Sequence, residues 1–117
     1  MKIQLLSEHI FIATKPIDFR KGLPSLCAFI VDTFIQLPQV GIFIFYNQQR
    51  NKIKLLGWHR NGFILLHKVL ETGKFHLSLY KDQNILEITP QQLSWLLAGL
   101  NWELMSLNDD LVFEDYF

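Results

Sequence analysis

Two apolar runs of strand length, joined by a short polar segment, constrain the fold of this chain more than any other feature. Residues 41–46 (GIFIFY) are rich in β-branched and aromatic side chains, and residues 52–58 (KIKLLGW) begin with alternating polar and apolar positions. The segment between them (NQQRN) is polar and turn-forming. Two such runs around a short polar turn predict a β-hairpin.

Basic side chains are dense on the predicted hairpin. Lys52 and Lys54 are two residues apart, so on a strand they share one face, and Arg50 continues their line if the strand extends that far. Cations with an aromatic side chain among them suit phosphate contact and base stacking. The alternative interpretation is a solvated face that protects the sheet from aggregation. The candidate DNA contacts are Arg20, Lys21, Arg50, Lys52, Lys54, Trp58, Arg60 and Lys68.

The length and composition are those of one folded domain with an acidic end. Half of the 117 residues are hydrophobic and 14% are aromatic, which is enough apolar surface for a self-sufficient core. All eleven Lys and Arg lie at or before Lys81, where they outnumber four acids by seven, and seven acids follow from Asp82 onward. We predict a basic domain at residues 1–102 and an acidic C-terminal tail at residues 103–117, which could bind a cationic partner or fold back on the domain.

The sequence offers no sign of export or of a membrane span. Its longest apolar runs are far below the ~18 residues that cross a bilayer, and the N-terminal segment is a poor signal peptide because Glu8 and His9 interrupt it. Cys27 is the only cysteine, which excludes an intrachain disulfide and a cysteine-based zinc site. We expect a soluble, cytoplasmic protein without a membrane partner.

The remaining patterns predict an α+β domain with a mostly antiparallel sheet of about five strands and three helices. Residues 89–92 (TPQQ) have the residues of an N-terminal capping box, and leucines at helical spacing follow. Apolar residues between 63 and 70 also have helical spacing, although residues 63–66 could form a buried strand. Strands are predicted at residues 10–13, 41–46, 52–58, 75–80 and 85–88, the last two pairing with each other, and helices at 24–36, at 63–70 and from Pro90 onward.

Catalytic and metal-binding patterns are absent from the sequence. It contains no HExxH pair, no glycine-rich phosphate loop, no GxSxG elbow and no Cys/His metal spacing. A metal-dependent nuclease needs several carboxylates that converge on a divalent ion, and the basic domain offers four without such a spacing. We therefore expect a non-enzymatic protein with no catalytic residue, no cofactor and no metal ion.

Four motifs in series resemble those of a known family. They are IDFRKG at residues 17–22, RNKIKLLGW at 50–58, NGF with KVLETGKF between 61 and 75, and TPQQL with LLAGLNW between 89 and 102. In this order and spacing they resemble the second open reading frame of the insertion sequence 66 family, an accessory protein of the TnpB type. The resemblance covers about residues 10–102. It implies a small bacterial mobile-element protein that supports transposition beside a separate DDE-type transposase, which carries the chemistry.

The resemblance leaves two interpretations of what the chain contacts. In the first, a non-enzymatic accessory protein of a bacterial insertion sequence contacts DNA through the basic hairpin face. In the second, a protein–protein adaptor docks on the separate transposase without binding DNA itself. Salt separates the two interpretations, because affinity for DNA falls with rising salt in proportion to the number of phosphates contacted.

Overall fold

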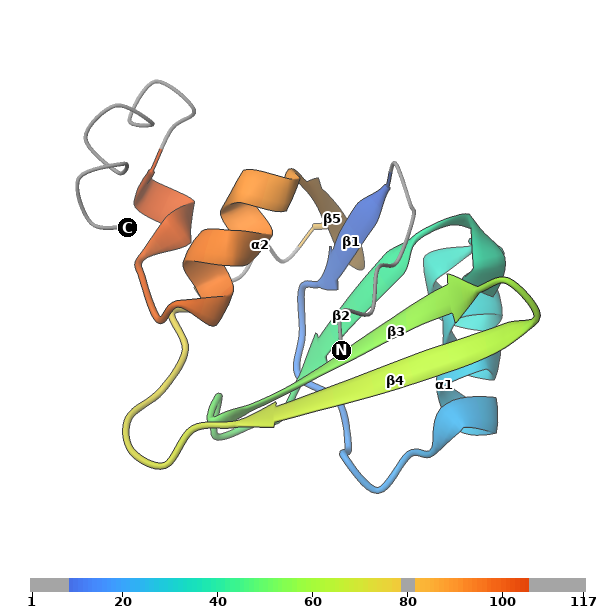
Figure 1. Ribbon diagram of the computed structural model, residues 1–117, viewed down its shortest axis with the longest axis horizontal. Helices are drawn as coiled ribbons and strands as arrows, with labels where there is room; N and C mark the ends of the chain where they lie inside the picture. The colour runs from blue at the N-terminus through green and yellow to red at the C-terminus, as the bar shows by residue number, and fades with distance from the viewer. Residues whose placement is uncertain (1–8, 79–81, 106–117) are drawn as a thin grey trace.

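Five β-strands form one mixed sheet in the order β4-β3-β2-β1-β5 (Figure 1). The computed structural model describes residues 9–78 and 82–105. β1 and β2 are parallel, and the other three neighbouring pairs are antiparallel. The prediction of an α+β domain with a mostly antiparallel sheet is therefore confirmed. The strands are β1 Ile10–Ala13, β2 Ile42–Tyr46, β3 Lys52–His59, β4 Gly62–Val69 and β5 Ile85–Ile88.

The predicted hairpin is present as β2 and β3, which pair with Phe43 opposite Leu56. Its turn is organised by Asn47, whose side-chain oxygen accepts the backbone N–H groups of Asn51 at 3.1 Å and Lys52 at 3.0 Å. Within this turn Arg50 has a left-handed backbone (φ 59°), which costs a non-glycine residue energy. The hydrogen bonds of the buried Asn47 amide hold the turn closed against that cost.

The helix predicted at residues 24–36 is present in two pieces. α1 spans Leu23–Phe29 and continues into a π-helical segment, η1 Ile30–Phe34, after which the 3₁₀ turn η2 Pro38–Val40 leads into β2. Pro24 lies in the first turn of α1, where its missing N–H costs no hydrogen bond. The buried side chains of α1 and η1 are Leu26, Ile30 and Phe34.

The second helix, α2 Pro90–Leu97, begins at the predicted capping box. The Thr89 hydroxyl accepts the backbone N–H of Gln92 at 3.1 Å, and the Gln92 side chain accepts the backbone N–H of Thr89 at 2.8 Å. Two donors that the helix itself cannot satisfy are thereby satisfied. The 3₁₀ turn η3 Trp102–Leu104 follows α2.

α1 lies on one face of the sheet. The ring of Phe29 contacts that of Phe45 on β2, with 6.3 Å between the ring centroids. Phe45 is opposite Lys54 on β3, and side chains of directly opposite residues lie on the same face. The face that α1 covers is therefore also the face of Lys54.

α2 lies on the other face, so the sheet separates the two helices (Figure 1). The ammonium of Lys68 on β4 donates to the carbonyl of Leu97, at the end of α2, at 2.7 Å. Lys68 is opposite Ile53, which points away from the side of its neighbour Lys54 because successive strand residues alternate. The apolar core thus extends over both faces of the sheet.

Residues 63–70 do not form the predicted helix. Nearly all of them belong to β4, which pairs with β3 over eight residue pairs, from Lys52–Val69 to His59–Gly62. Both faces of this strand carry apolar residues, so its apolar positions include a helical spacing that the fold does not use. A strand at residues 63–66 was the alternative, and it is the correct one, although β4 is half-exposed rather than buried. The described residues accordingly contain two α-helices instead of three.

The strand predicted at residues 75–80 is absent over residues 75–78, and residues 79–80 lie outside the described part. Phe75 and Leu77 are nonetheless buried, so their alternation with polar residues reflects burial without strand pairing. β5, the expected partner, pairs instead with β1, where Ala13 is opposite Ile85.

The predicted acidic tail is mostly outside the described residues. The described part of the chain ends just after η3, where Met105 packs against the core, and residues 106–117 lie beyond it. The division at residue 102 therefore stays a prediction. Within residues 9–78 and 82–105, no helix is long and apolar enough to cross a membrane.

Candidate nucleic-acid interface

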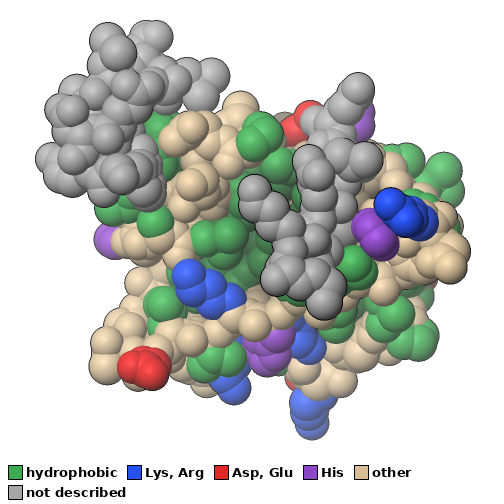
Figure 2. Space-filling view, in the orientation of Figure 1, with side chains coloured by type: hydrophobic (Ala, Val, Ile, Leu, Met, Phe, Trp, Pro, Cys, Tyr) green, Lys and Arg blue, Asp and Glu red, His purple; other side chains and the backbone are tan. Residues whose placement is uncertain are grey.

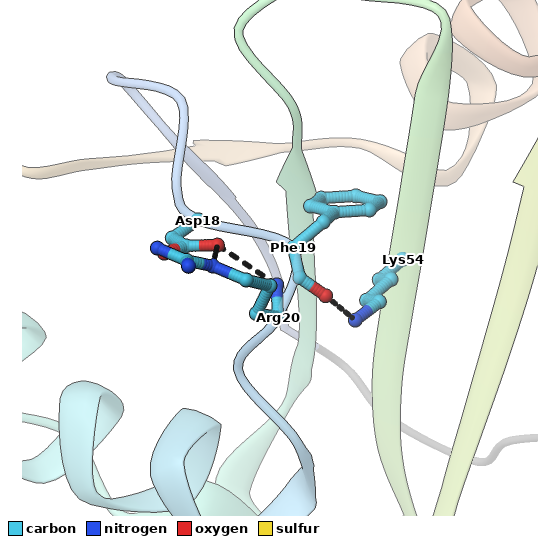
Figure 3. Close-up of polar contacts among 4 residues, drawn as sticks. All are labelled: Asp18, Phe19, Arg20 and Lys54. Atoms are coloured by element: carbon cyan, nitrogen blue, oxygen red, sulfur yellow. Dashed lines mark hydrogen bonds and ion pairs between the residues drawn. The ribbon is translucent and has the colours of Figure 1, made fainter.

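Lys54 connects β3 to the loop at residues 18–21. Its ammonium donates to the carbonyl oxygen of Phe19 at 2.9 Å (Figure 3) and lies 4.6 Å from the centre of the Phe19 ring. It also donates to the carbonyl oxygen of Lys21 at 3.2 Å. Lys54 is only 8% exposed. A buried ammonium needs carbonyl oxygens or an aromatic face in place of water. Lys54 finds both in this loop and so fixes the loop on the sheet.

This arrangement corrects the expectation of an open cationic face on the hairpin. Lys52 and Lys54 do share a face of β3, as their spacing predicts, but the loop at residues 18–21 covers Lys54. Charge counting along the sequence cannot separate a lysine that contacts phosphate from one that holds a loop. The burial of Lys54 argues for the second role.

The loop itself is closed by Asp18. One carboxylate oxygen accepts the backbone N–H of Arg20 at 2.9 Å, and the Asp18 carbonyl accepts the backbone N–H of Lys21 at 3.1 Å. The guanidinium of Arg20 binds both carboxylate oxygens, with 2.6 Å from Nη2 to Oδ2 (Figure 3). The side-chain hydrogen bond with Arg20 lowers the pKa of Asp18 to about 2. Arg20 nevertheless keeps 91% of its side chain exposed.

We expect the Asp18 carboxyl carbon to titrate with a midpoint near 2 in an NMR experiment, against the usual 3.8. Because the pKa of the folded state is the lower one, the stability that the ion pair contributes is present above 3.8 and is lost as the pH falls through about 2. That contribution is small, since solvent screens an exposed pair. Arg20→Gln should raise the midpoint toward 3.8 without reaching it, because the backbone N–H of residue 20 still donates to the carboxylate. A midpoint that does not move in this variant would contradict the ion pair.

Two cations besides Arg20 lie on this side of the sheet: Lys21, within the loop at residues 18–21, and Lys52, on β3. The ammonium of Lys21 lies 5.9 Å from the centre of the Phe29 ring on α1. Lys52 precedes Lys54 by two residues on β3, which places it about 7 Å along the strand on the same face. We call Arg20, Lys21 and Lys52 the basic surface.

The structure does not bring the remaining candidate residues to the basic surface. Arg60 lies in the turn between β3 and β4, and Trp58 packs on Phe63 near it, with 5.0 Å between the ring centroids. The length of β3 separates this end from Lys52 by about 26 Å. Lys68 lies on the opposite face. The Lys and Arg side chains in Figure 2 are accordingly scattered over the face shown and do not form one patch.

Arg50 belongs to a separate, partly buried group with Tyr46 and Glu103. Burial raises the pKa of Glu103, while the backbone N–H of Ser78, at 2.7 Å, and the nearby charge of Arg50 act to lower it. Burial also raises the pKa of the Tyr46 phenol. Glu103 is the first residue of the predicted acidic tail, so the charge of Arg50 acts on one acid of that tail.

Within the described residues, ion pairs neutralise little of the positive charge. Among the described residues, the only contact within 4.0 Å between Lys or Arg and a carboxylate is that of Arg20 with Asp18. The other ion pair in this part of the chain joins His9 to Glu87 at 3.1 Å. The described residues therefore include lysines with no carboxylate within 4.0 Å, which suits an anionic partner.

The chemistry of the other reactive groups is limited. In residues 9–78 and 82–105, no three His, Cys, Asp or Glu side chains are arranged to hold a metal ion. Cys27 is partly buried and packs against the core, and burial raises the pKa of its thiol. A thiol with a raised pKa is a poor nucleophile at neutral pH.

Comparisons with known proteins add a family to this geometry. The model of the family described as "IS66 Orf2 like protein" matches residues 8–106. Two relatives from Sinorhizobium fredii (strain NBRC 101917 / NGR234) also match. The uncharacterized protein y4jC is 37% identical over 95 residues, which cover 80% of this chain and 80% of that protein. The uncharacterized protein y4hO is 31% identical over 95 residues, or 80% and 82% of the two chains. No solved structure matches.

Proposed function

The chain belongs to the family of IS66 Orf2-like proteins, accessory proteins of an insertion sequence, and on that premise we propose that it supports transposition by contacting DNA. The contact in this proposal is made by the basic surface, Arg20, Lys21 and Lys52. A separate DDE-type transposase of the same element carries out the strand chemistry. The accessory protein acts in the bacterial cytoplasm and has no catalytic role.

The observation that carries the proposal is a loop of cations that hydrogen bonds from Lys54 hold on the sheet. Lys54 anchors the backbone of the loop through two carbonyl oxygens, and this holds the segment that carries Arg20 and Lys21 on the face of the sheet that Lys52 shares. Phosphate contacts made by ordered cations lose less conformational entropy on binding than contacts made by a mobile segment. The contacts position the protein on the duplex without reading its sequence.

A second candidate function is docking on the transposase, and a different surface supports it. Four large apolar residues on η1, η2 and the segment between them are exposed, among them Ile35 at 76%. Ile35 also has a left-handed backbone (φ 55°), which is a strained conformation for a β-branched residue. The four residues are Val31, Ile35, Leu37 and Val40. An exposed apolar group of this kind suits a protein partner.

The first experiment is fluorescence anisotropy of a labelled duplex from the terminal repeat of the element, titrated with the full chain. Three phosphate contacts predict that affinity falls about 40-fold between about 50 mM and about 200 mM salt. In the double variant Lys21→Gln with Lys52→Gln, the remaining contact predicts a loss of only about 3- to 4-fold over the same range. Affinity at low salt should also be lower in this variant.

Arg60→Asn is the matched control, because it removes one exposed cation at the far end of β3. Asparagine tolerates the left-handed backbone of this turn, so the fold should be unaffected. We expect the salt dependence of the wild-type chain. If Arg60→Asn reduces the salt dependence as much as the double variant does, the DNA contact lies at the turn between β3 and β4. No binding even at the lower salt would contradict DNA contact. In that event, co-purification with the transposase that Ile35→Asp abolishes would identify the docking function.

A further inference from the structure

A cavity of about 390 Å³ lies beyond the carboxyl end of β1. One wall is the chain that leaves β1, the second is α1 with η1, and the third is the turn before β5. β1 and β2 are parallel neighbours, and in sheets with parallel strands ligands bind beyond the carboxyl ends of those strands. Its lining includes Thr14, Lys15, Asp18, Lys21, Phe29 and Asn84.

The walls of the cavity are joined by hydrogen bonds and so are fixed before any ligand arrives. The backbone N–H of Thr14 donates to the carbonyl of Asn84 at 3.1 Å, and the Thr14 hydroxyl donates to the carbonyl of Gln83. The side-chain amide of Asn84 donates to the carbonyl of Thr33 on η1 at 3.3 Å. Lys54 holds the chain that leaves β1 at its other end, through the carbonyl oxygens of Phe19 and Lys21. A preformed cavity costs little conformational entropy on binding.

The lining of the cavity combines aromatic and cationic side chains. Phe29 and Phe34 line it with their rings in edge contact, 5.1 Å between centroids. Lys15 and Lys21 line it as well. Asp18 is there as well, but Arg20 binds both of its carboxylate oxygens and offsets part of its charge. Two ammonium groups therefore remain for an anion.

We propose that this cavity binds one nucleotide unit, with its phosphate on Lys15 and Lys21 and its base against the phenylalanine wall. The volume lies within the range of about 300–1,000 Å³ that is usual for small-molecule sites, which suits one nucleotide. A duplex, whose major groove alone is about 12 Å wide, is too large. Stacking on an aromatic side chain accepts any base, because every base has a π face. The site does not depend on the duplex contact proposed above, although Lys21 borders both.

The nucleotide could come from a frayed or overhanging DNA strand or from solution, since both present the same phosphate and base. The test is a titration of the ¹⁵N-labelled full chain with deoxythymidine monophosphate, thymidine and inorganic phosphate. We expect the nucleotide to shift the amides of Thr14, Thr33 and Asn84 and to bind at least about ten-fold more tightly than either fragment, a gain of about 1.4 kcal/mol. Lys15→Gln with Lys21→Gln should weaken it about ten-fold or more, whereas Lys74→Gln, outside the cavity, should not.

A duplex with a one-nucleotide overhang separates the two sources. Tighter binding than to the blunt duplex, with competition from the mononucleotide, supports the DNA end as the source. Equal binding of both duplexes, with the mononucleotide still shifting the cavity amides, supports nucleotide from solution. If the mononucleotide causes no shift at these amides while the blunt duplex still binds, the cavity proposal is wrong and the duplex contact stands. If the mononucleotide shifts the cavity amides and the duplex does not bind, the duplex contact is wrong and the cavity proposal stands.

Discussion

Trp102→Ala should lower the free energy of unfolding by about 3–5 kcal/mol, the usual cost of removing a buried aromatic side chain. Trp102 is 2% exposed in the turn η3, and its indole N–H donates to the carbonyl of His76 at 2.7 Å. It therefore ties the end of the described chain to the segment that carries the buried Phe75 and Leu77. Urea unfolding followed by circular dichroism measures the effect.

Two variants separate the contributions of Trp102. Trp102→Phe keeps an aromatic ring but loses the indole donor, and we expect a smaller loss of about 1–3 kcal/mol. Leu104→Ala is the control in the same turn. Because Leu104 is 81% exposed, its truncation should change stability by no more than about 0.5 kcal/mol. Equal effects of Trp102→Ala and Leu104→Ala would show that η3 is not part of the folded core.

Lys54→Met should lower the free energy of unfolding by about 2 kcal/mol, the order expected for charged hydrogen bonds to two carbonyl oxygens. Methionine keeps most of the aliphatic packing of the lysine side chain, so the loss reports on the ammonium. It leaves the carbonyls of Phe19 and Lys21 without their donor and frees the loop at residues 18–21 from β3. Urea unfolding measures the loss, and the amide signals of the loop should broaden or move.

Lys52→Met is the control for Lys54, because the two lysines share a face of β3 and differ in what they bind. No hydrogen bond of the Lys52 side chain is found among the described residues, so we expect a change within about 0.5 kcal/mol. The two variants also separate the roles in DNA binding. Lys52→Met should reduce the salt dependence of affinity with the fold intact. If Lys54→Met is no less stable than Lys52→Met, the anchoring role of Lys54 is wrong.

The local part of the fold was predictable because local chemistry determines it. The Thr89–Gln92 capping box needs only four residues, and the hairpin of β2 and β3 needs two apolar runs and a polar turn. The prediction of a helix at residues 63–70 was wrong because the apolar spacing there fits both a helix and a strand. Hydrogen bonding to β3 decides for the strand. The pairing of β5 with β1 joins residues more than 70 positions apart, and no local pattern determines it.

The candidate site divides in the same way. The sequence places Lys52 and Lys54 correctly on one face, because strand residues alternate. It cannot reveal that Phe19 and Lys21, more than thirty residues earlier, turn their carbonyl oxygens toward Lys54. The cavity was also missed, because its three walls come from separate parts of the chain. In the sequence, only Pro16 and the polar run at residues 82–84 indicate loops at two of these walls.

The central claim, that DNA lies on the basic surface, is tested most directly by mapping amide shifts in the ¹⁵N-labelled full chain as a terminal-repeat duplex is added at low salt. The account predicts the largest shifts at Arg20, Lys21 and Lys52, with the amides of α2, on the opposite face of the sheet, unmoved. Shifts concentrated on α2 or at the turn that contains Arg60, with the loop at residues 18–21 unaffected, would contradict it.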